Sequence, residues 1–316
     1  MNYLVNQKKC LILGGNGFIG QHLSRALLKK GFIVRILSKT KKEISLSDSL
    51  SQNPNIEWIT GDFCDEKLII EATKQVSYVF HLISTTLPSS SNLDPYFDIE
   101  SNVGSTINLL KACVLNKVEK ILFSSSGGTV YGIPKYLPIN ESHPQNPISS
   151  YGIQKLTIER YLYLYNHLYE LKSSILRISN PFGIGQNINR GQGLITTFLI
   201  KVLRGENIEI WGDGSVIRDF IYIDDVIESF LAALEHPHKF DIYNIGSGVG
   251  TSILEVIKEI EIVLSVQARV KFKEPRSLDV PANILDITHS QNELCWSPKI
   301  SLTEGIKMMA ADLKNN

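Results

Sequence analysis

The chain has 316 residues, of which 43% are hydrophobic, and its 32 Lys and Arg residues balance 32 Asp and Glu residues. This length is ample for a buried core, and the zero net charge gives no field that would attract nucleic acid or an anionic membrane. The first nine residues contain Asn, Gln and Lys where a signal peptide needs an apolar run, and no later stretch approaches the roughly 18 apolar residues of a membrane span. We therefore expect a soluble, cytoplasmic protein.

The four cysteines lie far apart and form no C-x-x-C pair. They are Cys10, Cys64, Cys113 and Cys295. This spacing indicates neither a disulfide framework nor a zinc site. We expect reduced, mostly buried thiols and no metal site.

Short apolar strands alternate with helical stretches over the first 180 residues. The first strand, 9–13, ends at glycines and leads into a helix that ends near Gly31. This alternation predicts a doubly wound parallel sheet of the Rossmann type, with helices on both faces, so residues 1–180 are predicted to form a dinucleotide-binding domain. Further strands are predicted at 32–37, 56–60, 76–83, 120–125 and 174–179, with helices at 65–74, 95–115 and 150–171.

The regular alternation ends after residue 180. Residues 181–316 are expected to form mainly a smaller C-terminal lobe over the carboxyl ends of the parallel strands, where open α/β sheets bind ligands. Segments near 218–245 are expected to return to the main sheet. We predict helices at 194–204 and from 224, 252 and 301, and strands at 208–211, 220–223 and 241–245.

A glycine-rich turn joins the first strand to the first helix. Glycine lets the backbone turn tightly and approach a pyrophosphate, whose charge is met by free N–H groups at the start of a helix. A tight turn without a ligand is the competing interpretation, but the strand–turn–helix placement favours dinucleotide binding. The turn reads G-x-x-G-x-x-G, and its predicted cofactor contacts are Gly14, Gly17, Phe18, Ile19 and Gly20.

The residues that would select between NAD and NADP follow the second and third strands. Ser38 and Lys39 stand where NAD-binding proteins carry an acidic residue for the ribose 2′-hydroxyl. They suit a 2′-phosphate or belong to a solvated lysine-rich loop, so NADP stays open beside NAD. Asp62, followed by Phe63, is a candidate partner of the adenine amino group, with an ordinary helix N-cap as the alternative.

One of two Tyr-x-x-x-Lys pairs fits a helix. Pro134 interrupts the earlier pair, whereas Tyr151 and Lys155 lie at i, i+4 near the start of a predicted helix. An ammonium beside a phenol favours the phenolate, which lowers the pKa of tyrosine from about 10 toward the range that allows proton transfer at neutral pH. A surface pair on an amphipathic helix is the competing interpretation.

Several further motifs accompany this pair. The serine run Ser124-Ser125-Ser126 follows a buried strand and offers hydroxyls at the expected carboxyl edge of the sheet. The remaining motifs are Val130-Tyr131-Gly132, Arg177-Ile-Ser-Asn180-Pro-Phe-Gly183, Arg218-Asp219-Phe220-Ile-Tyr222 and Asn244-Ile-Gly-Ser-Gly248. Taken together, the motifs resemble the extended short-chain dehydrogenase/reductase superfamily and its NAD-dependent epimerase/dehydratase family, in particular the nucleotide-sugar epimerases.

The resemblance implies a role for each matching residue. Tyr151 would be the acid/base, Lys155 would bind the nicotinamide ribose and perturb Tyr151, and Asn102 and Ser124 would support the cofactor. In the lobe of residues 181–316, arginines would grip the nucleotide diphosphate, since their forked donors suit phosphate oxygens. A structural ion pair with Asp219 is the alternative for Arg218, and a surface loop is the alternative for Arg276. The implied substrate-binding residues are Asn180, Gly193, Leu194, Arg218, Arg276 and Asp279.

The chain departs from the family at the hydroxyl that assists the catalytic tyrosine. That position is Gly127, so Ser126 or Thr129 must supply the catalytic hydroxyl, or it is dispensable. Related dehydratases carry an Asp-Glu pair just after this position to eliminate water, whereas this chain has Gly128-Thr129. The resemblance therefore favours epimerisation over dehydration.

The resulting prediction is an NAD-dependent 4-epimerase of a nucleotide sugar, UDP-hexose type, acting by transient oxidation at C4 and hydride return. An NADP-dependent reductase of 4-keto nucleotide sugars is the alternative enzyme. The alternative of another class is a non-catalytic, dinucleotide-sensing binding protein. Helix 150–171 carries more apolar and aromatic residues than one buried face needs, so we expect a homodimer built on this helix and helix 95–115.

Overall fold

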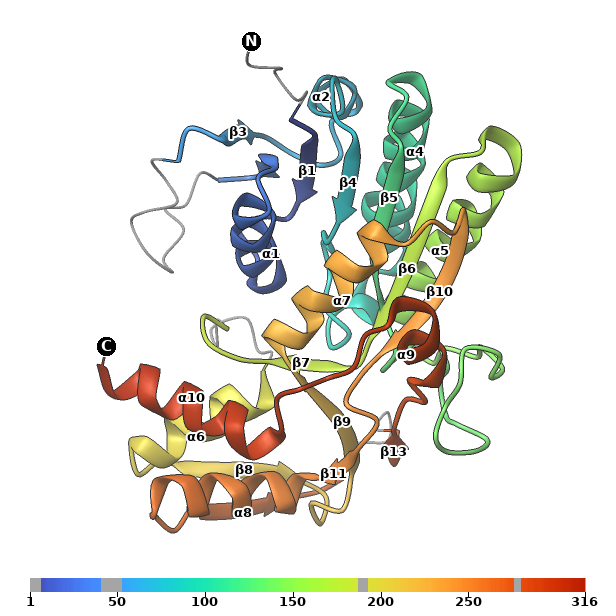
Figure 1. Ribbon diagram of the computed structural model, residues 1–316. Coiled ribbons are helices and arrows are strands. Elements are labelled where there is room, and N and C mark those ends of the chain that lie inside the picture. The colour runs from blue at the N-terminus through green and yellow to red at the C-terminus, as the bar shows by residue number, and fades with distance from the viewer. Residues whose placement is uncertain (1–6, 41–52, 187–192, 276–279, 316) are drawn as a thin grey trace.

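A seven-stranded parallel sheet with the order β10-β6-β5-β4-β1-β2-β3 is the largest element of the computed structural model, which describes residues 7–40, 53–186, 193–275 and 280–315 (Figure 1). The strand order reverses between β1 and β4, which is the topological switch point of a doubly wound fold. The predicted Rossmann-type fold class is thus confirmed. The strands are β1 (Lys9–Leu13), β2 (Ile33–Ser38), β3 (Ile56–Thr60), β4 (Tyr78–His81), β5 (Lys120–Ser126), β6 (Lys172–Ile178) and β10 (Phe240–Ile245).

Helices cover both faces of the sheet because its strands alternate apolar side chains between the two faces. In β1, Cys10 and Ile12 pack toward α1 and α7, whereas Leu11 and Leu13 pack toward α2, α4 and α5. Figure 1 shows α1 and α7 on one face and α4 and α5 on the other. The helices are α1 (Phe18–Lys29), α2 (Glu66–Ala72), α4 (Ser105–Leu115), α5 (Ser150–Tyr169) and α7 (Ile223–Glu235).

The helix predicted over 95–115 contains a π-helical segment. A short 3₁₀ turn, η1 (Ser91–Leu93), precedes α3 (Pro95–Asp98), which runs into the π-helical η2 (Ile99–Gly104) and then into α4. A π-helical turn changes the direction in which side chains leave a helix, and such turns are frequent at functional sites. This segment approaches the start of α5.

The chain after β6 builds a smaller lobe from two further sheets. One is formed by β9 (Ile217–Tyr222) with β7 (Asn180–Phe182), β11 (Gly250–Ser252) and β13 (Ala282–Asn283), and the other by β8 (Asn207–Trp211) with β12 (Arg269–Lys273). The remaining helices are α6 (Leu194–Leu203), α8 (Ile253–Leu264) and α10 (Leu302–Asn315), which pack on one another, and α9 (Thr288–Leu294), which packs on β10.

One segment of the C-terminal part crosses back to the main sheet. β10 pairs with β6, and α7 packs on β5 and β6, whereas β9 stays in the smaller lobe. The division into a dinucleotide-binding domain, 1–180, and a nucleotide-sugar-binding lobe, 181–316, stays a prediction.

Two expectations about the chain as a whole have structural outcomes. Within the described ranges, no helix has the length and apolar character that crossing a bilayer requires. All four cysteines are free thiols, but Cys64 and Cys295 are exposed, so the expectation of mostly buried thiols is wrong for half of them.

Candidate active site

The glycine turn lies between β1 and α1, as the sequence predicts. Gly14 has a φ angle of +86°, in the left-handed region that favours glycine. At Gly20, a Cβ would come 2.3 Å from the carbonyl oxygen of Gly14, so glycine lets α1 approach the turn closely. Gly17 is the N-cap, and no side chain of the described residues caps the first turn, which contains Phe18 and Ile19. This uncapped helix start fits the pyrophosphate of a dinucleotide.

Ser38 and Lys39 lie at the carboxyl end of β2, and Asp62 follows the carboxyl end of the neighbouring strand β3. The Lys39 ammonium lies 3.0 Å from the Asp62 carboxylate, which also accepts the N–H of Cys64 at 3.0 Å. This backbone hydrogen bond, followed by the Lys39 contact, lowers the pKa of Asp62. Asp65 is the N-cap of α2, so the helix-cap interpretation of Asp62 is wrong. The end of β2 has no carboxylate of its own. Asp62, just after β3, supplies one and balances the charge of Lys39.

Asn102 lies in the π-helical segment, and its side-chain amide forms hydrogen bonds with other protein groups. Its Oδ1 accepts the N–H of Thr85 at 2.9 Å, and its Nδ2 donates to Asp98 Oδ1 at 3.0 Å. Asp98 is fully buried, and its other oxygen accepts the hydroxyl of Ser150 at 2.6 Å. Asn102 therefore fixes a buried carboxylate against the first residue of α5. Sequence reasoning missed Asp98, because a helical aspartate is ordinarily solvated and only the packing of α5 buries this one.

Tyr151 and Lys155 lie together at the start of α5, which begins where the sequence predicts. Ser149 caps the helix by accepting the N–H of Gly152 at 3.2 Å. Lys155 is only 3% exposed, and its Nζ donates to the carbonyl oxygen of Ser124 at 2.8 Å. The same Nζ lies 5.5 Å from the centre of the Tyr151 ring. The end of β5 and the start of α5 thus meet at the carboxyl edge of the sheet.

The protonation of this pair differs from the sequence-based expectation. The sequence predicts that Lys155 lowers the pKa of Tyr151 toward neutrality. Instead, burial and, to a smaller extent, the negative charge of Asp98 together raise the pKa of Tyr151 to about 12. Burial also lowers the pKa of Lys155 to about 8, against the attraction of Glu159 and Asp98. Tyr151 therefore holds its proton at neutral pH, and a nearby positive charge or hydrogen bonds to the phenolate would lower its pKa.

Two residues are candidates for the hydroxyl that is missing at Gly127. A Cβ at Gly127 would lie 2.6 Å from the side chain of Leu285 and 3.0 Å from the carbonyl oxygen of Arg177, so the packing disfavours a larger residue. The Thr129 hydroxyl is buried and has no hydrogen-bond partner among the described residues. Ser126, the last residue of β5, is half-buried. Burying an unpaired hydroxyl is costly, so Thr129 is the stronger candidate.

Asn180 and Arg218 lie on neighbouring strands of the smaller lobe. Asn180 is on β7, opposite Phe220 of β9, and its side chain donates to the carbonyl oxygen of Asp219 at 2.9 Å. Arg218 is half-buried and donates to the carbonyl oxygen of Val280 at 2.7 Å. The two side chains are therefore anchored in the region that joins the lobe to the main sheet.

The other predicted substrate-binding residues are placed only in part. Gly193 has a φ angle of +90° and precedes Leu194, the first residue of α6, whose first turn has no side-chain cap within the described part of the chain. Arg276 and Asp279 lie outside the described residues.

Asp219 holds the loop after β10 in place. It is fully buried, and its carboxylate accepts the N–H groups of Ser247, Gly248 and Leu285 at 2.7, 3.2 and 3.2 Å. Burial raises the pKa of Asp219, and these hydrogen bonds oppose that shift. Asp219 thus joins β9 both to the motif Asn244–Gly248 and to Leu285, which lies in the segment that leads into α9.

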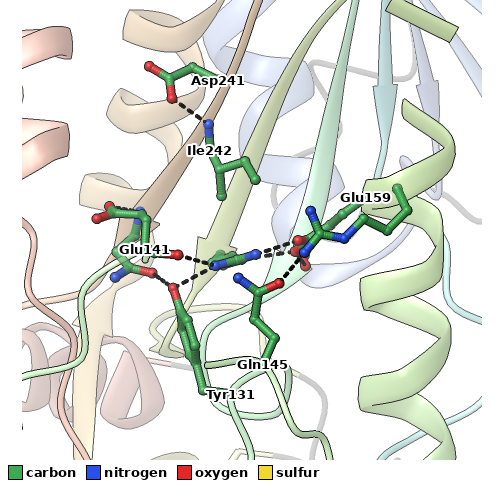
Figure 2. Close-up of polar contacts among 10 residues, drawn as sticks. Tyr131, Glu141, Gln145, Glu159, Asp241 and Ile242 are labelled. Carbon is green, nitrogen blue, oxygen red and sulfur yellow. Dashed lines mark hydrogen bonds and ion pairs between the residues drawn. The ribbon is translucent and has the colours of Figure 1, made fainter. Parts of the chain in front are cut away.

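A buried ion pair supports the segment around Tyr131, which follows the serine run at the end of β5. Arg177 on β6 and Glu159 on α5 are both buried, with Nη2 2.6 Å from Oε2 and Nε 3.0 Å from Oε1. Arg177 Nη1 donates to the Tyr131 hydroxyl at 2.9 Å and to the Glu141 carbonyl oxygen at 3.2 Å (Figure 2). The Tyr131 hydroxyl in turn donates to Asn244 at 2.6 Å. The motifs around Tyr131, Arg177 and Asn244 therefore include residues that brace the site, and sequence reasoning missed Glu159.

Comparisons with known proteins agree with this geometry. Residues 10–246 match the NAD dependent epimerase/dehydratase family. The chain is 37% identical to a provisionally named UDP-glucose 4-epimerase of Methanocaldococcus jannaschii, over 97% of this chain and 98% of that one. It is 34% identical to a dTDP-4-dehydro-6-deoxyglucose reductase of Escherichia coli, over 96% and 97%. The solved UDP-glucose 4-epimerase of Thermotoga maritima with UDP-glucose is 32% identical, with a TM-score of 0.90 over 97% and 99% of the two chains.

Proposed function

The chain belongs to the NAD dependent epimerase/dehydratase family, and we propose that it is a nucleotide-sugar 4-epimerase that acts on a UDP-linked hexose. The observation that carries the proposal is the buried Lys155, held by the Ser124 carbonyl at 2.8 Å beside the Tyr151 ring. The UDP-glucose complex of the Thermotoga maritima protein supports UDP as the nucleotide. A cytoplasmic role in carbohydrate metabolism is part of the same proposal.

The cofactor of the family is NAD. When bound, NAD would supply a hydride acceptor and donor for C4 of the sugar. The chain's own residues would hold the reactants and move the proton. The glycine turn from Gly14 to Gly20 would hold the cofactor pyrophosphate. Tyr151, as its phenolate, would accept the proton of the sugar 4-hydroxyl when C4 is oxidised and would return it to the keto oxygen when C4 is reduced. The Lys155 ammonium would hold the nicotinamide ribose. Asn180, Arg218 and Arg276 would hold the diphosphate of the substrate, and Asp279 would contact the nucleotide ribose. Arg276 and Asp279 lie outside the described residues.

The ion pair between Lys39 and Asp62 supports NAD over NADP. A 2′-phosphate beside Lys39 would also meet the Asp62 carboxylate, 3.0 Å from the ammonium, and would be repelled by it. Both side chains are exposed, so this preference is expected to be modest and to weaken with salt.

A reductase of 4-keto nucleotide sugars is the second candidate function. The 34% identity to the Escherichia coli reductase favours it. The two enzymes differ in their use of the cofactor, because an epimerase regenerates NAD in each cycle whereas a reductase consumes a reduced dinucleotide. A non-catalytic binding protein is disfavoured, because Tyr151 and Lys155 are both intact.

The experiment that separates these functions examines the dinucleotide and the turnover together. The purified protein is denatured, the released dinucleotide is identified, and native protein is assayed with UDP-glucose and UDP-galactose without added cofactor. We expect bound NAD and interconversion of the two sugars. Consumption of NADPH with a 4-keto nucleotide sugar and no interconversion would establish the reductase instead.

Thr129→Ala is expected to slow turnover more than Ser126→Ala, because the buried Thr129 hydroxyl lacks a protein partner. Losing one neutral hydrogen bond of about 0.5–1.5 kcal/mol corresponds to a roughly 2- to 12-fold slower rate. Thr129→Ser should restore the rate, and retained dinucleotide with an unchanged melting temperature would exclude a folding defect. A larger effect at Ser126 would assign the role to that residue, and no effect at either would show that Tyr151 needs no hydroxyl partner.

We also propose a homodimer built on α5 and the helical stretch 95–115. Sedimentation is expected to give a dimer at micromolar concentration, and Leu164→Glu with Leu168→Glu should produce monomers. Phe272→Glu, at an exposed apolar residue on β12, is the matched control and should leave the dimer intact. A monomeric parent protein would contradict the proposal. The exposed apolar residues that need a partner are Tyr96, Phe97, Ile99, Leu115, Ile153, Tyr163, Leu164, Leu168 and Tyr169.

A further inference from the structure

Three histidines and two carboxylates gather near the amino end of β10. One of the histidines, His289 on α9, has its Nε2 3.1 Å from both carboxylate oxygens of Asp241. His236 and His238 lie in the connection between α7 and β10, Asp241 is on β10, and Glu293 is on α9. A ring nitrogen from each of His236 and His238 and a carboxylate oxygen of Glu293 lie within 4.8 Å of one another. The Asp241 carboxylate is fixed by the N–H of Ile242 at 2.7 Å (Figure 2).

This cluster is separate from the candidate active site. Ser126 is level with Ile178, and Ile178 is level with Ile245, the last residue of β10. Asp241 lies four residues earlier on the same strand, a separation of roughly 13 Å at about 3.3 Å per residue. The cluster therefore lies at the opposite edge of the sheet, and the proposed reaction does not use it.

His236 and His238 each have one ring nitrogen beside a protein group other than Glu293. His238 Nε2 lies 3.7 Å from Glu293 Oε2, and its Nδ1 lies 3.4 Å from Asp241 Oδ2. His236 Nδ1 lies 3.4 Å from the Tyr243 hydroxyl, so Nε2 stays available to a ligand. Metal-binding histidines characteristically have such a partner on the second nitrogen, because it fixes the tautomer and the orientation of the ring.

The charges around the cluster suit a cation. Asp241 and Glu293 contribute two carboxylates, while Lys120 adds a positive charge and donates to the carbonyl oxygens of Ala233 and His236 at 2.6 and 2.9 Å.

We propose that His236, His238 and Glu293 bind a divalent transition-metal ion, with Zn²⁺ as the best fit, and that Asp241 orients His238. Zn²⁺ takes imidazole nitrogens and carboxylate oxygens at about 2.0–2.2 Å in tetrahedral sites, with ligand atoms roughly 3.3 Å apart. Small side-chain rotations would bring the present atoms to that spacing, and water would complete the coordination. The ion would tie the connection between α7 and β10 to α9 and so act as a structural clamp.

The test uses untagged, chelator-treated protein titrated with Co²⁺ and then with Zn²⁺. We expect one Co²⁺ per chain with the visible absorption of a four-coordinate site, displacement by Zn²⁺, and a higher melting temperature with Zn²⁺. His236→Ala and His238→Ala should weaken binding by more than about 100-fold, and Asp241→Asn by about 10–100-fold.

His167→Ala removes an exposed histidine on α5 and is the matched control, which should bind as the parent does. Melting temperatures without metal verify that each variant is folded. Absence of saturable Co²⁺ binding by the parent at submillimolar concentration would overturn the proposal. Unchanged binding in the folded His238→Ala variant would overturn it as well.

Discussion

Tyr151→Phe is expected to keep the fold and the bound dinucleotide while turnover falls roughly 10²- to 10⁴-fold. Phenylalanine retains the ring that lies 5.5 Å from the Lys155 ammonium and removes only the hydroxyl that would carry the proton. Turnover with UDP-glucose, the amount of dinucleotide released on denaturation and the melting temperature would be measured together. Retained cofactor with lost turnover would separate proton transfer from binding.

Tyr163→Phe is the matched control, since Tyr163 is an exposed tyrosine on the same helix. It should leave turnover unchanged. The pH dependence adds a second readout, because a tyrosine with a pKa raised to about 12 gains its base form as pH increases. Where loss of this proton limits the rate, parent turnover rises with pH and the residual rate of Tyr151→Phe does not. Turnover of Tyr151→Phe within a few-fold of the parent would place the acid/base elsewhere.

Arg177→Met is expected to destabilise the fold by about 3–5 kcal/mol, because it leaves the Glu159 carboxylate buried without its partner. It also removes the donors to the Tyr131 hydroxyl and the Glu141 carbonyl oxygen. The free energy of unfolding from urea titration measures the loss. Turnover of the folded variant, measured without urea, would show whether loss of the Arg177 contact to Tyr131 also displaces the active-site residues.

The double variant Arg177→Met with Glu159→Leu serves as the control for charge burial. Removing both charges takes away the uncompensated ion, so the double variant should be more stable than Arg177→Met alone. It should remain less stable than the parent, because the contacts to Tyr131 and Glu141 are lost in both. The single variant Glu159→Leu completes the comparison. If the double variant loses as much stability as Arg177→Met and Glu159→Leu lose in sum, the two side chains are not energetically coupled.

The parallel sheet was predictable because its signals are local. The apolar run of β1, the glycines that follow it and the helical spacing after Phe18 all lie within about twenty residues, and similar runs mark β2 to β6. β13 has two residues and β7 three, so neither is long enough to show the repeated alternation that identifies a strand in a sequence. Such strands form because longer partners, here β9, bring them into register.

The candidate site was predictable only where its residues are close in sequence. Tyr151 and Lys155 are four residues apart, so their shared helix face follows from the helical period. The contact between Lys39 and Asp62 joins the ends of two strands, and the burial of Asp98 and Glu159 depends on the packing of α5. Asp98 and Glu159 are recognisable as supports of the site only in the tertiary structure, which removes both carboxylates from water.

The placement of β10 beside β6 also has a consequence for protein synthesis. Until residues 240–245 leave the ribosome, β6 has unpaired backbone groups along one side, and the face of β5 and β6 that α7 covers is open to water. The nascent parallel sheet therefore stays incomplete until about three quarters of the chain has been translated. A chaperone that shields strand edges would act on this protein late in translation, between the emergence of β6 and that of β10.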